Sequence, residues 1–273
     1  MNEPIILLTG ASSGIGKSAA ELLMNRGAKV YGASRRGGEP QKAQNGTGEI
    51  IPVKMDVTHE EEIKAVVTRI LAENGRLDVV ICNAGNGIAG AVEDTSDEEM
   101  RYQYETNFFG VVKTINACLP VFRSQHSGKI IATSSVAAIV PIPFQTFYSS
   151  VKASLLIFMQ ALTIEVKPFG IQCCSILPGD TKTGFTESRK CTIASQSPNS
   201  PYFDKMNTSV ERMEKDEQNG MSAESVAKKI VYQVYNKRMK ISVVPGIQYK
   251  IICFLFNRVP ASLRLWIVGL IYG

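Results

Sequence analysis

The N-terminal residues constrain the fold most, because they place a glycine-rich loop between a strand and a helix. Residues 5–9 form a continuous apolar run, as a parallel strand buried on both faces requires. The helical spacing of residues 17–26 follows the loop and ends at Gly27. The loop between them is Gly10-Ala11-Ser12-Ser13-Gly14-Ile15-Gly16. This order predicts the first unit of a parallel α/β sheet.

The alternation of strand and helix continues along the chain. Further apolar strands are expected at residues 29–33, 50–55, 77–82, 129–133, 171–177 and 241–244. Helices are expected between them at residues 60–73, 98–121, 149–166 and 222–237. This pattern predicts a single domain of Rossmann-type α/β fold, a doubly wound parallel sheet, over residues 1–245.

The end of the alternation leaves two segments of different character. Residues 180–220 are polar and rich in Ser, Thr, Asn and Pro, which predicts a substrate loop or lid. Residues 246–273 form an apolar, basic C-terminal extension. Three roles remain open for this extension: it covers a pocket, forms an oligomer interface or makes peripheral contact with a membrane. Arg258, Pro260 and Arg264 argue against a spanning helix.

Composition and charge exclude several classes of protein. With 44% hydrophobic and 20% charged residues, the chain is too apolar for disorder. It has only two histidines, so we expect no metal site. The net charge of +5 is concentrated near the C-terminus without a basic, aromatic-rich stripe, so we expect no nucleic-acid partner. Six cysteines without C-x-x-C pairing and no signal-peptide pattern predict a cytoplasmic location.

The glycine loop has the spacing of a dinucleotide-binding turn. Gly10 makes the tight turn, Gly14 lets the backbone approach a pyrophosphate, and Gly16 lets the helix pack closely on the sheet. The same loop makes Ser12, Ser13 and Ile15 candidate cofactor contacts.

The end of the second strand favours NADP(H) over NAD(H). It carries Ser34 where a carboxylate for the ribose 2′-hydroxyl is expected, and Arg35 follows, whose guanidinium suits a 2′-phosphate. A solvated pair of surface arginines is the alternative for Arg35 and Arg36.

A tyrosine and a lysine share one helical face, since Tyr148 and Lys152 are four residues apart. An ammonium near a phenol lowers the tyrosine pKa toward neutral pH, so that the phenol exchanges a proton with a carbonyl oxygen. Ser135, just past a predicted strand, is placed to hold the same oxygen. Tyr and Lys at this spacing are common, so the pair carries weight only together with the other motifs.

The combined motifs resemble the short-chain dehydrogenase/reductase family over residues 4–245, and among its members those acting on steroids, retinoids or fatty ketones. The resemblance rests on the glycine loop, Asn83-Ala84-Gly85, Asn107, Ser135, Tyr148, Lys152 and Pro178-Gly179, in that order.

The resemblance implies a role for each matching residue. Tyr148 is the general acid/base, and Lys152 lowers its pKa and binds the nicotinamide ribose. Ser135 holds the substrate oxygen, with Ser134 as a neighbour that fits the spacing less well, and Asn107 anchors a water. The remaining residues expected to bind NADP(H) are Asp56, Val57, Asn83, Ala84, Gly85, Pro178, Gly179, Thr181 and Thr183. Thr183 matches the family segment and Thr181 is an adjacent competitor, while a plain turn residue is the alternative for Asp56.

The function expected from these residues is NADP(H)-dependent interconversion of a carbonyl and a secondary alcohol. The apolar run at 136–144 predicts a hydrophobic small-molecule substrate. A 3-oxoacyl-thioester reductase and a non-catalytic NADP(H)-binding regulator are the alternatives, although a regulator needs no proton relay. Family members also form homodimers or homotetramers through their long helices, which we expect here.

Overall fold

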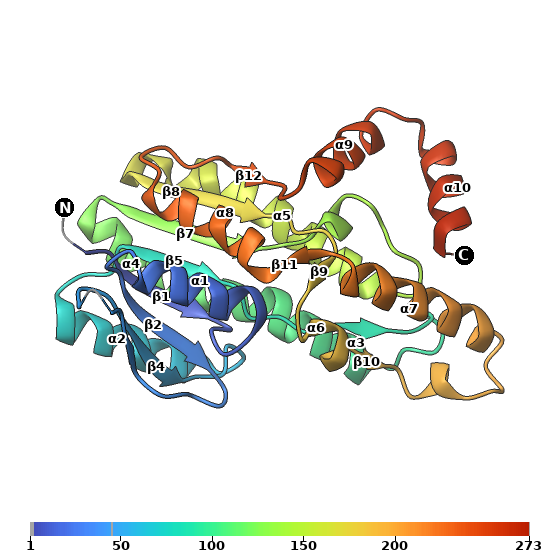
Figure 1. The fold of residues 1–273 in the computed structure, drawn as a ribbon, viewed down its shortest axis with the longest axis horizontal. Helices are drawn as coiled ribbons and strands as arrows, with labels where there is room; N and C mark the ends of the chain where they lie inside the picture. Colours follow the sequence, from blue (N-terminus) through green and yellow to red (C-terminus); the bar gives the residue numbers. More distant parts are fainter. Residues whose placement is uncertain (1–2, 45, 273) are drawn as a thin grey trace.

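A twisted eight-stranded sheet with strand order β12-β8-β7-β5-β1-β2-β4-β3 forms the centre of the molecule (Figure 1). The computed structural model describes residues 3–44 and 46–272. The strands are β1 (Ile5–Thr9), β2 (Lys29–Ser34), β3 (Gln41–Lys42), β4 (Glu49–Lys54), β5 (Val79–Cys82), β6 (Ile88–Ala89), β7 (Gly128–Thr133), β8 (Ile171–Ile176), β9 (Thr181–Lys182), β10 (Lys190–Cys191), β11 (Met221–Ser222) and β12 (Ser242–Val243).

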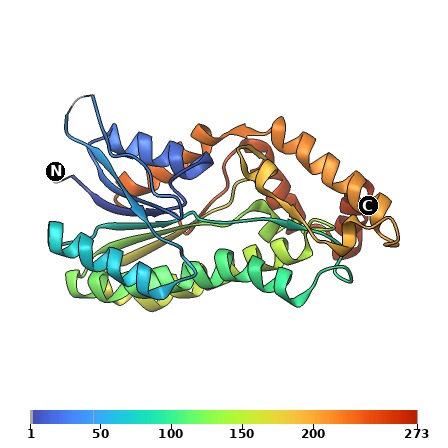
Figure 2. The same ribbon diagram turned by 90° about the horizontal axis from the view of Figure 1, so that it is seen from below.

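Helices cover both faces of this sheet, as Figure 2 shows. The helices are α1 (Gly14–Met24), α2 (Glu60–Asn74), α3 (Asp97–Tyr104), α4 (Gly110–Gln125), α5 (Thr146–Val166), α6 (Phe185–Ser188), α7 (Phe203–Gln218), α8 (Ala223–Tyr235), α9 (Ile247–Phe256) and α10 (Ala261–Tyr272). Shorter helical turns are η1 (Glu105–Phe109), η2 (Val136–Ala138), η3 (Lys167–Phe169) and η4 (Ala194–Gln196). One apolar core joins the sheet to α2, α4 and α5, and a second joins its other face to α1 and α8.

The fold confirms the expected doubly wound parallel sheet. Every pairing in the large sheet is parallel except that of the edge strand β3 with β4. The chain order reverses between β1 and β5, and in such sheets a crevice for ligands opens at the carboxyl ends of the strands at this point. The segment 146–169 has the length and hydropathy of a membrane span, but Leu155, Met159 and Leu162 pack in the core below the sheet.

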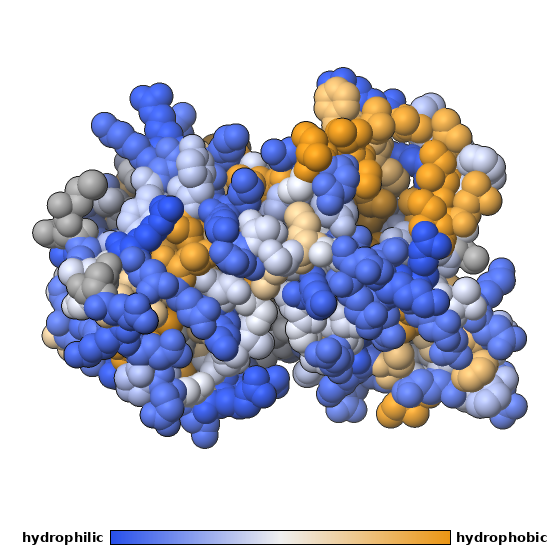
Figure 3. Space-filling model, viewed as in Figure 1, coloured by the Kyte–Doolittle hydropathy of each residue, from blue (hydrophilic) through white to orange (hydrophobic). Residues whose placement is uncertain are grey.

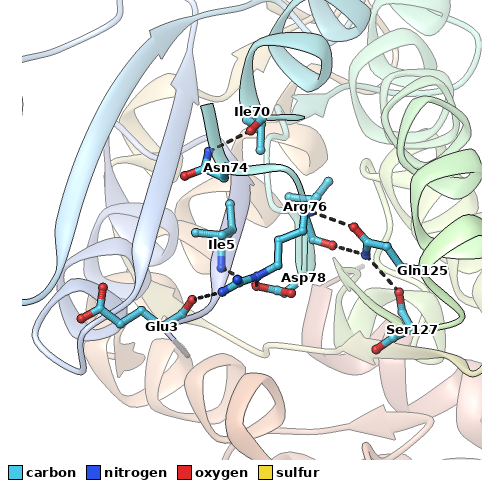
Figure 4. Close-up of polar contacts among 9 residues, drawn as sticks. Glu3, Ile5, Ile70, Asn74, Arg76, Asp78, Gln125 and Ser127 are labelled. Atoms are coloured by element: carbon cyan, nitrogen blue, oxygen red, sulfur yellow. Dashed lines mark hydrogen bonds and ion pairs between the residues drawn. The ribbon is translucent and has the colours of Figure 1, made fainter. Parts of the chain in front are cut away.

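The amino ends of the strands, at the opposite edge, are closed by satisfied polar contacts (Figure 4). Asp78 accepts hydrogen bonds from the Ile5 amide at 2.8 Å and from Arg76 Nε at 3.1 Å. Gln125 binds both backbone groups of Leu77, accepting from its N–H and donating to its carbonyl. These contacts tie β1, β5 and α4 together. The polar groups of Asp78, Arg76 and Gln125 are thus hydrogen-bonded within the protein.

The polar segment 180–220 contains regular structure that its composition does not suggest. Its longest element is α7, so the prediction of a loop over this whole stretch is wrong. Met206, Val210 and Met213 fall on one helical face and pack with Ala89, and Phe144 borders the same cluster. Three apolar residues at helical spacing outweigh the polar surroundings, because they bury a stripe against the rest of the protein.

The C-terminal extension forms two helices that extend beyond the sheet. α10 contacts α7, and Tyr249 of α9 donates a hydrogen bond to Asp180 at 2.9 Å. Their other faces are strongly apolar and exposed, as the hydrophobic area over α9 and α10 in Figure 3 shows. The extension is therefore attached along one side and uncovered along the other.

One threonine at the carboxyl edge fixes the relation of the two central strands. Thr9 ends β1, and its Oγ1 accepts hydrogen bonds from the N–H groups of Asn83 at 3.0 Å and Ala84 at 3.1 Å. Both N–H groups lie directly after β5. The hydroxyl therefore sets the path of the chain where β5 enters the crevice.

We expect Thr9→Val to destabilise the protein by about 2–5 kcal/mol, because the two amide groups lose their acceptor while the shape is kept. The matched control is Thr114→Val. This residue is also buried, but its hydroxyl only donates to the Gly110 carbonyl within α4. Denaturant unfolding measures both free energies. Equal losses in the two variants would contradict the role of Thr9.

Candidate active site

The glycine loop is as tight as the sequence predicts. Gly10 has φ +71°, and its N–H donates to the Ala33 carbonyl at 2.8 Å. A Cβ on Gly16 would lie 2.1 Å from the Gly10 carbonyl oxygen, so only glycine fits there. Ser13 precedes α1 without its side chain capping the helix. Free N–H groups at a helix start and an uncommitted hydroxyl fit a phosphate.

Arg35 and Asp56 lie together at the ends of β2 and β4. Arg35 is exposed, and its positive charge acts on Asp56. Burial raises the pKa of Asp56, but hydrogen bonds from the Thr58 N–H and hydroxyl, with the Arg35 charge, bring it below its usual value. Asp56 therefore also has a local role in the turn, and the side chain of Val57 is part of the core under α4.

Asn83 joins the glycine loop to the next strand of the sheet. Its Nδ2 donates to the Gly10 carbonyl at 3.3 Å, and its Oδ1 accepts from Thr133 Oγ1 at 3.1 Å. The ends of β1, β5 and β7 are thereby held in one polar network. Ala84 and Gly85 follow directly, so the predicted cofactor residues of these three strands meet at one edge.

Asn107 lies in the π-helical turn η1, which interrupts the otherwise continuous helix from α3 to α4. Its Nδ2 donates to Asn86 Oδ1 at 2.6 Å and to the Gln103 carbonyl at 2.9 Å. The residue is fully buried, yet Oδ1 has no hydrogen-bond partner among the described residues. Such turns cluster at functional sites, and an unpaired buried acceptor fits an ordered water or ligand group.

Gly85 lies next to the unpaired Oδ1 of Asn107. A Cβ there would lie 2.8 Å from Asn107 Oδ1 and 3.7 Å from Lys152 Nζ. Any side chain would fill the space between them. The structure thus keeps open a small polar cradle between the β5 loop, η1 and α5.

Tyr148, Lys152 and Ser135 come together at the mouth of this cradle. Both α5 residues lie in its first two turns, since the helix begins at Thr146 rather than at the predicted Ser149. Lys152 Nζ donates to the Thr133 carbonyl at 3.1 Å and lies 5.6 Å from the centre of the Tyr148 ring. Ser135 donates to the Pro178 carbonyl at 3.4 Å. Ser134 is instead buried against the Lys152 carbonyl, which favours Ser135 as the available hydroxyl.

The pKa values of the pair differ from the sequence expectation. Burial raises the pKa of Tyr148 to about 12, and a hydrogen bond with Ser135 offsets this only in part. Burial also lowers the pKa of Lys152 to about 8. The pKa of Tyr148 is therefore raised rather than lowered as the sequence predicts, because desolvation of the phenolate dominates.

The Pro178–Thr183 segment closes the other side of the site. A Cβ on Gly14 would lie 3.2 Å from Thr183 Cβ, so this threonine faces the glycine loop. Thr181 instead donates to the Gly179 carbonyl at 2.8 Å. The Tyr249 ring of α9 covers Gly179, where a Cβ would lie 2.2 Å from Cε1.

Several polar side chains near the site were not predicted from the sequence. Asn86 and Gln103 support Asn107, and Asn86 follows the Asn-Ala-Gly motif directly, which is a local signal that was available. Arg189 and Glu217 form a buried ion pair near Tyr148. They come from segments that look polar and unstructured, so no local pattern marks them.

Comparison with known proteins supports the assignment of the fold and family. The short chain dehydrogenase family model matches residues 4–193. The 3-ketodihydrosphingosine reductase of Bacteroides thetaiotaomicron is 42% identical over 220 residues, 81% of this chain and 79% of the relative. A short-chain dehydrogenase of Streptomyces avermitilis has a TM-score of 0.81 at 26% identity, over 97% of this chain and 96% of the other.

A second solved structure shows the same fold with a nucleotide bound. It is a short chain dehydrogenase/reductase of Burkholderia phymatum in complex with NAD, with a TM-score of 0.79 at 19% identity, covering 94% of this chain and 93% of the other. The chain described here belongs to the short-chain dehydrogenase/reductase family of oxidoreductases.

Proposed function

We propose that this protein is an NADP(H)-dependent reductase of a long-chain ketone whose polar end carries an amino group and a hydroxyl. The observation that carries the proposal is the cluster of Ser135, Tyr148 and Lys152, which approach one another from the segment after β7 and from α5. The relative from Bacteroides, named for 3-ketodihydrosphingosine, supports this class of substrate. That compound combines a long alkyl chain with a ketone, an adjacent ammonium and a primary hydroxyl.

The residues present fit a nicotinamide dinucleotide along the carboxyl edge of the sheet. The α1 N-terminus and the glycine loop would hold the pyrophosphate, and Arg35 the ribose 2′-phosphate. Lys152 and Asn107 face the open cradle where the nicotinamide ribose would lie. The reduced cofactor supplies a hydride to the ketone carbon.

The protein's own side chains then handle the oxygen of the ketone. Ser135 Oγ and the Tyr148 hydroxyl donate hydrogen bonds to it, which stabilises the negative charge that develops. Tyr148 transfers its proton to that oxygen, so the ketone becomes an alcohol. A tyrosine with a raised pKa is protonated at neutral pH, which suits reduction. Lys152 and Asn107 are in position to return a proton through a water.

An apolar groove lined by residues that neighbour Ser135 and Tyr148 in the sequence would take the alkyl chain. Its walls come from the segment after Ser135, from the first turns of α5 and from α10. Apolar lining residues include Ala137, Ile139, Ile142, Leu265 and Val268. This supports the role of the C-terminal extension as cover over a pocket for a hydrophobic substrate.

Two alternatives use the same scaffold. A 3-oxoacyl-thioester reductase would keep the catalytic residues but needs no recognition of an ammonium. A regulator that only binds NADP(H) would not require Ser135, Tyr148 and Lys152 to converge. The converging hydroxyl, phenol and ammonium favour an enzyme.

Exposed apolar surfaces support two further proposals. Phe109 at the end of η1 and Ile157 and Ile164 on α5 are exposed, which suits a homo-oligomer interface. The helices α9 and α10 expose apolar side chains, among them Phe254 and Trp266. Residues 237–272 also contain six Lys/Arg and no acidic residue. This combination suits contact with an anionic membrane surface. Light scattering and sedimentation with anionic vesicles test these contacts. Six free cysteines support a reducing compartment.

We expect wild-type protein to reduce a long-chain amino ketone with NADPH, and Tyr148→Phe to lose at least about 100-fold in kcat, because the proton donor is removed. NADPH binding, followed by fluorescence, should be retained in the variant. Rates on a 3-oxoacyl thioester and a steroid ketone are compared in the same assay. A preference for the thioester would overturn the substrate class, and full activity of Tyr148→Phe would overturn the site.

We expect the kcat/KM of reduction to be constant at low pH and to fall as pH rises through about 8, where Lys152 loses its charge. Tyr148 stays protonated over this range, since its pKa is about 12. The control is Lys152→Arg, whose guanidinium does not titrate there. Persistence of the same fall in that variant would assign it to another group.

We expect Arg35→Asp to reverse the preference for NADPH over NADH, because it replaces a partner of the 2′-phosphate with a partner of the 2′-hydroxyl. The change should exceed about tenfold in the ratio of the two kcat/KM values. Arg36→Asp makes the same charge change one residue further and is the control. An equal shift in both variants would indicate general electrostatics rather than a contact by Arg35.

A further inference from the structure

Arg189 is a buried arginine that neither the fold nor the mechanism above explains. Its side chain is 2% exposed, and its Nη2 pairs with a carboxylate oxygen of Glu217. Nε and Nη1 have no hydrogen-bond partner among the described residues. Leaving buried donors unpaired is unfavourable, and more so on a charged group. Such groups in a folded protein point to a ligand or an ordered water.

The arginine lies one aromatic ring away from Tyr148. The Phe185 ring is 5.8 Å from the Tyr148 ring, and the guanidinium carbon of Arg189 is 5.7 Å from the same Phe185 ring. Phe185 packs closely on Gly87, where an added Cβ would lie 2.7 Å from its Cζ. The guanidinium is therefore close to the reaction centre, and its charge acts on Tyr148.

Two partly buried carboxylates, Glu217 and Asp180, lie near Arg189, since its charge acts on both. Glu217 accepts a second hydrogen bond from Thr186 Oγ1 at 2.6 Å, and Asp180 accepts from the Tyr249 hydroxyl at 2.9 Å. The three groups together carry one excess negative charge. Burial raises the pKa of both carboxyls, and the charge of Asp180 raises that of Glu217 further. A cation bound between them would relieve this imbalance.

We propose that Arg189, Glu217 and Asp180 form the subsite for the polar head of the substrate. The two carboxylates accept hydrogen bonds from the ammonium next to the ketone, and the unpaired N–H groups of Arg189 donate to the hydroxyl oxygen beyond it. The ketone oxygen then lies at Tyr148 and Ser135, and the alkyl chain extends into the groove under α10. This inference rests on the proposed function and adds the residues that distinguish an amino ketone from a plain ketone.

The test compares two substrates on the full-length protein with NADPH. One is a long-chain amino ketone with its hydroxyl, and the other is a plain ketone of the same chain length and ketone position. We expect Glu217→Gln to lower kcat/KM for the amino ketone at least about tenfold more than for the plain ketone, mainly through KM, because one charged hydrogen bond is lost. Arg189→Lys should show the same selectivity, since lysine cannot reproduce the fork of donors.

Matched variants separate recognition from folding. Glu211→Gln changes an exposed carboxylate on the same helix α7 and should not alter the ratio of the two substrates. Asp180→Asn keeps the size of the side chain and should repeat the selective loss if Glu217→Gln does not fold. An N-acetylated amino ketone, which lacks the positive charge, should lose no more on Glu217→Gln than the plain ketone.

The outcomes distinguish this inference from the function it rests on. Equal losses for both substrates in Glu217→Gln, Arg189→Lys and Asp180→Asn would overturn the subsite and leave the reductase in place. Wild-type reduction of the plain ketone but not the amino ketone would overturn the substrate class of the proposed function, and the subsite with it. Wild-type protein that reduces neither substrate would overturn the proposed function, and the subsite with it.

Discussion

The close approach of backbone to backbone at the carboxyl edge of the sheet is the constraint on which the site depends. A Cβ at Gly16 would meet the Gly10 carbonyl, and one at Gly85 would meet Asn107 Oδ1. Because these positions carry no side chain, the glycine loop, the β5 loop and η1 converge within a few ångströms. Thr9 and Asn83 then lock this arrangement with hydrogen bonds between the strand ends.

Burial shifts the pKa values of the two residues Tyr148 and Lys152 in opposite directions. It raises the pKa of Tyr148 and lowers that of Lys152, so each group is pushed toward its neutral form. Among residues 3–44 and 46–272, Arg189 has one carboxylate partner for its fork of donors. The site therefore holds polar groups whose requirements are only partly met within the chain, as expected where a charged cofactor and a polar substrate bind.

The C-terminal helices connect this chemistry with the surface. Tyr249 of α9 covers Gly179 and binds Asp180, and Leu265 and Val268 of α10 line the groove. The same two helices expose their remaining apolar side chains (Figure 3). Pocket cover and an external apolar face are thus two sides of one element, so the alternatives for this segment do not exclude each other.

Periodicity and motifs in the sequence were sufficient to predict the doubly wound sheet and to single out Gly10, Asn107, Ser135, Tyr148 and Lys152 as candidate site residues. Strand and helix periodicity and short motifs are local, so they can be read along the chain. The sequence did not predict α7, whose three buried residues are diluted by polar neighbours. Nor did it predict the pairing of Arg189 with Glu217 or the raised pKa of Tyr148. These features follow from the tertiary structure, because burial and charge pairing depend on which distant segments come into contact.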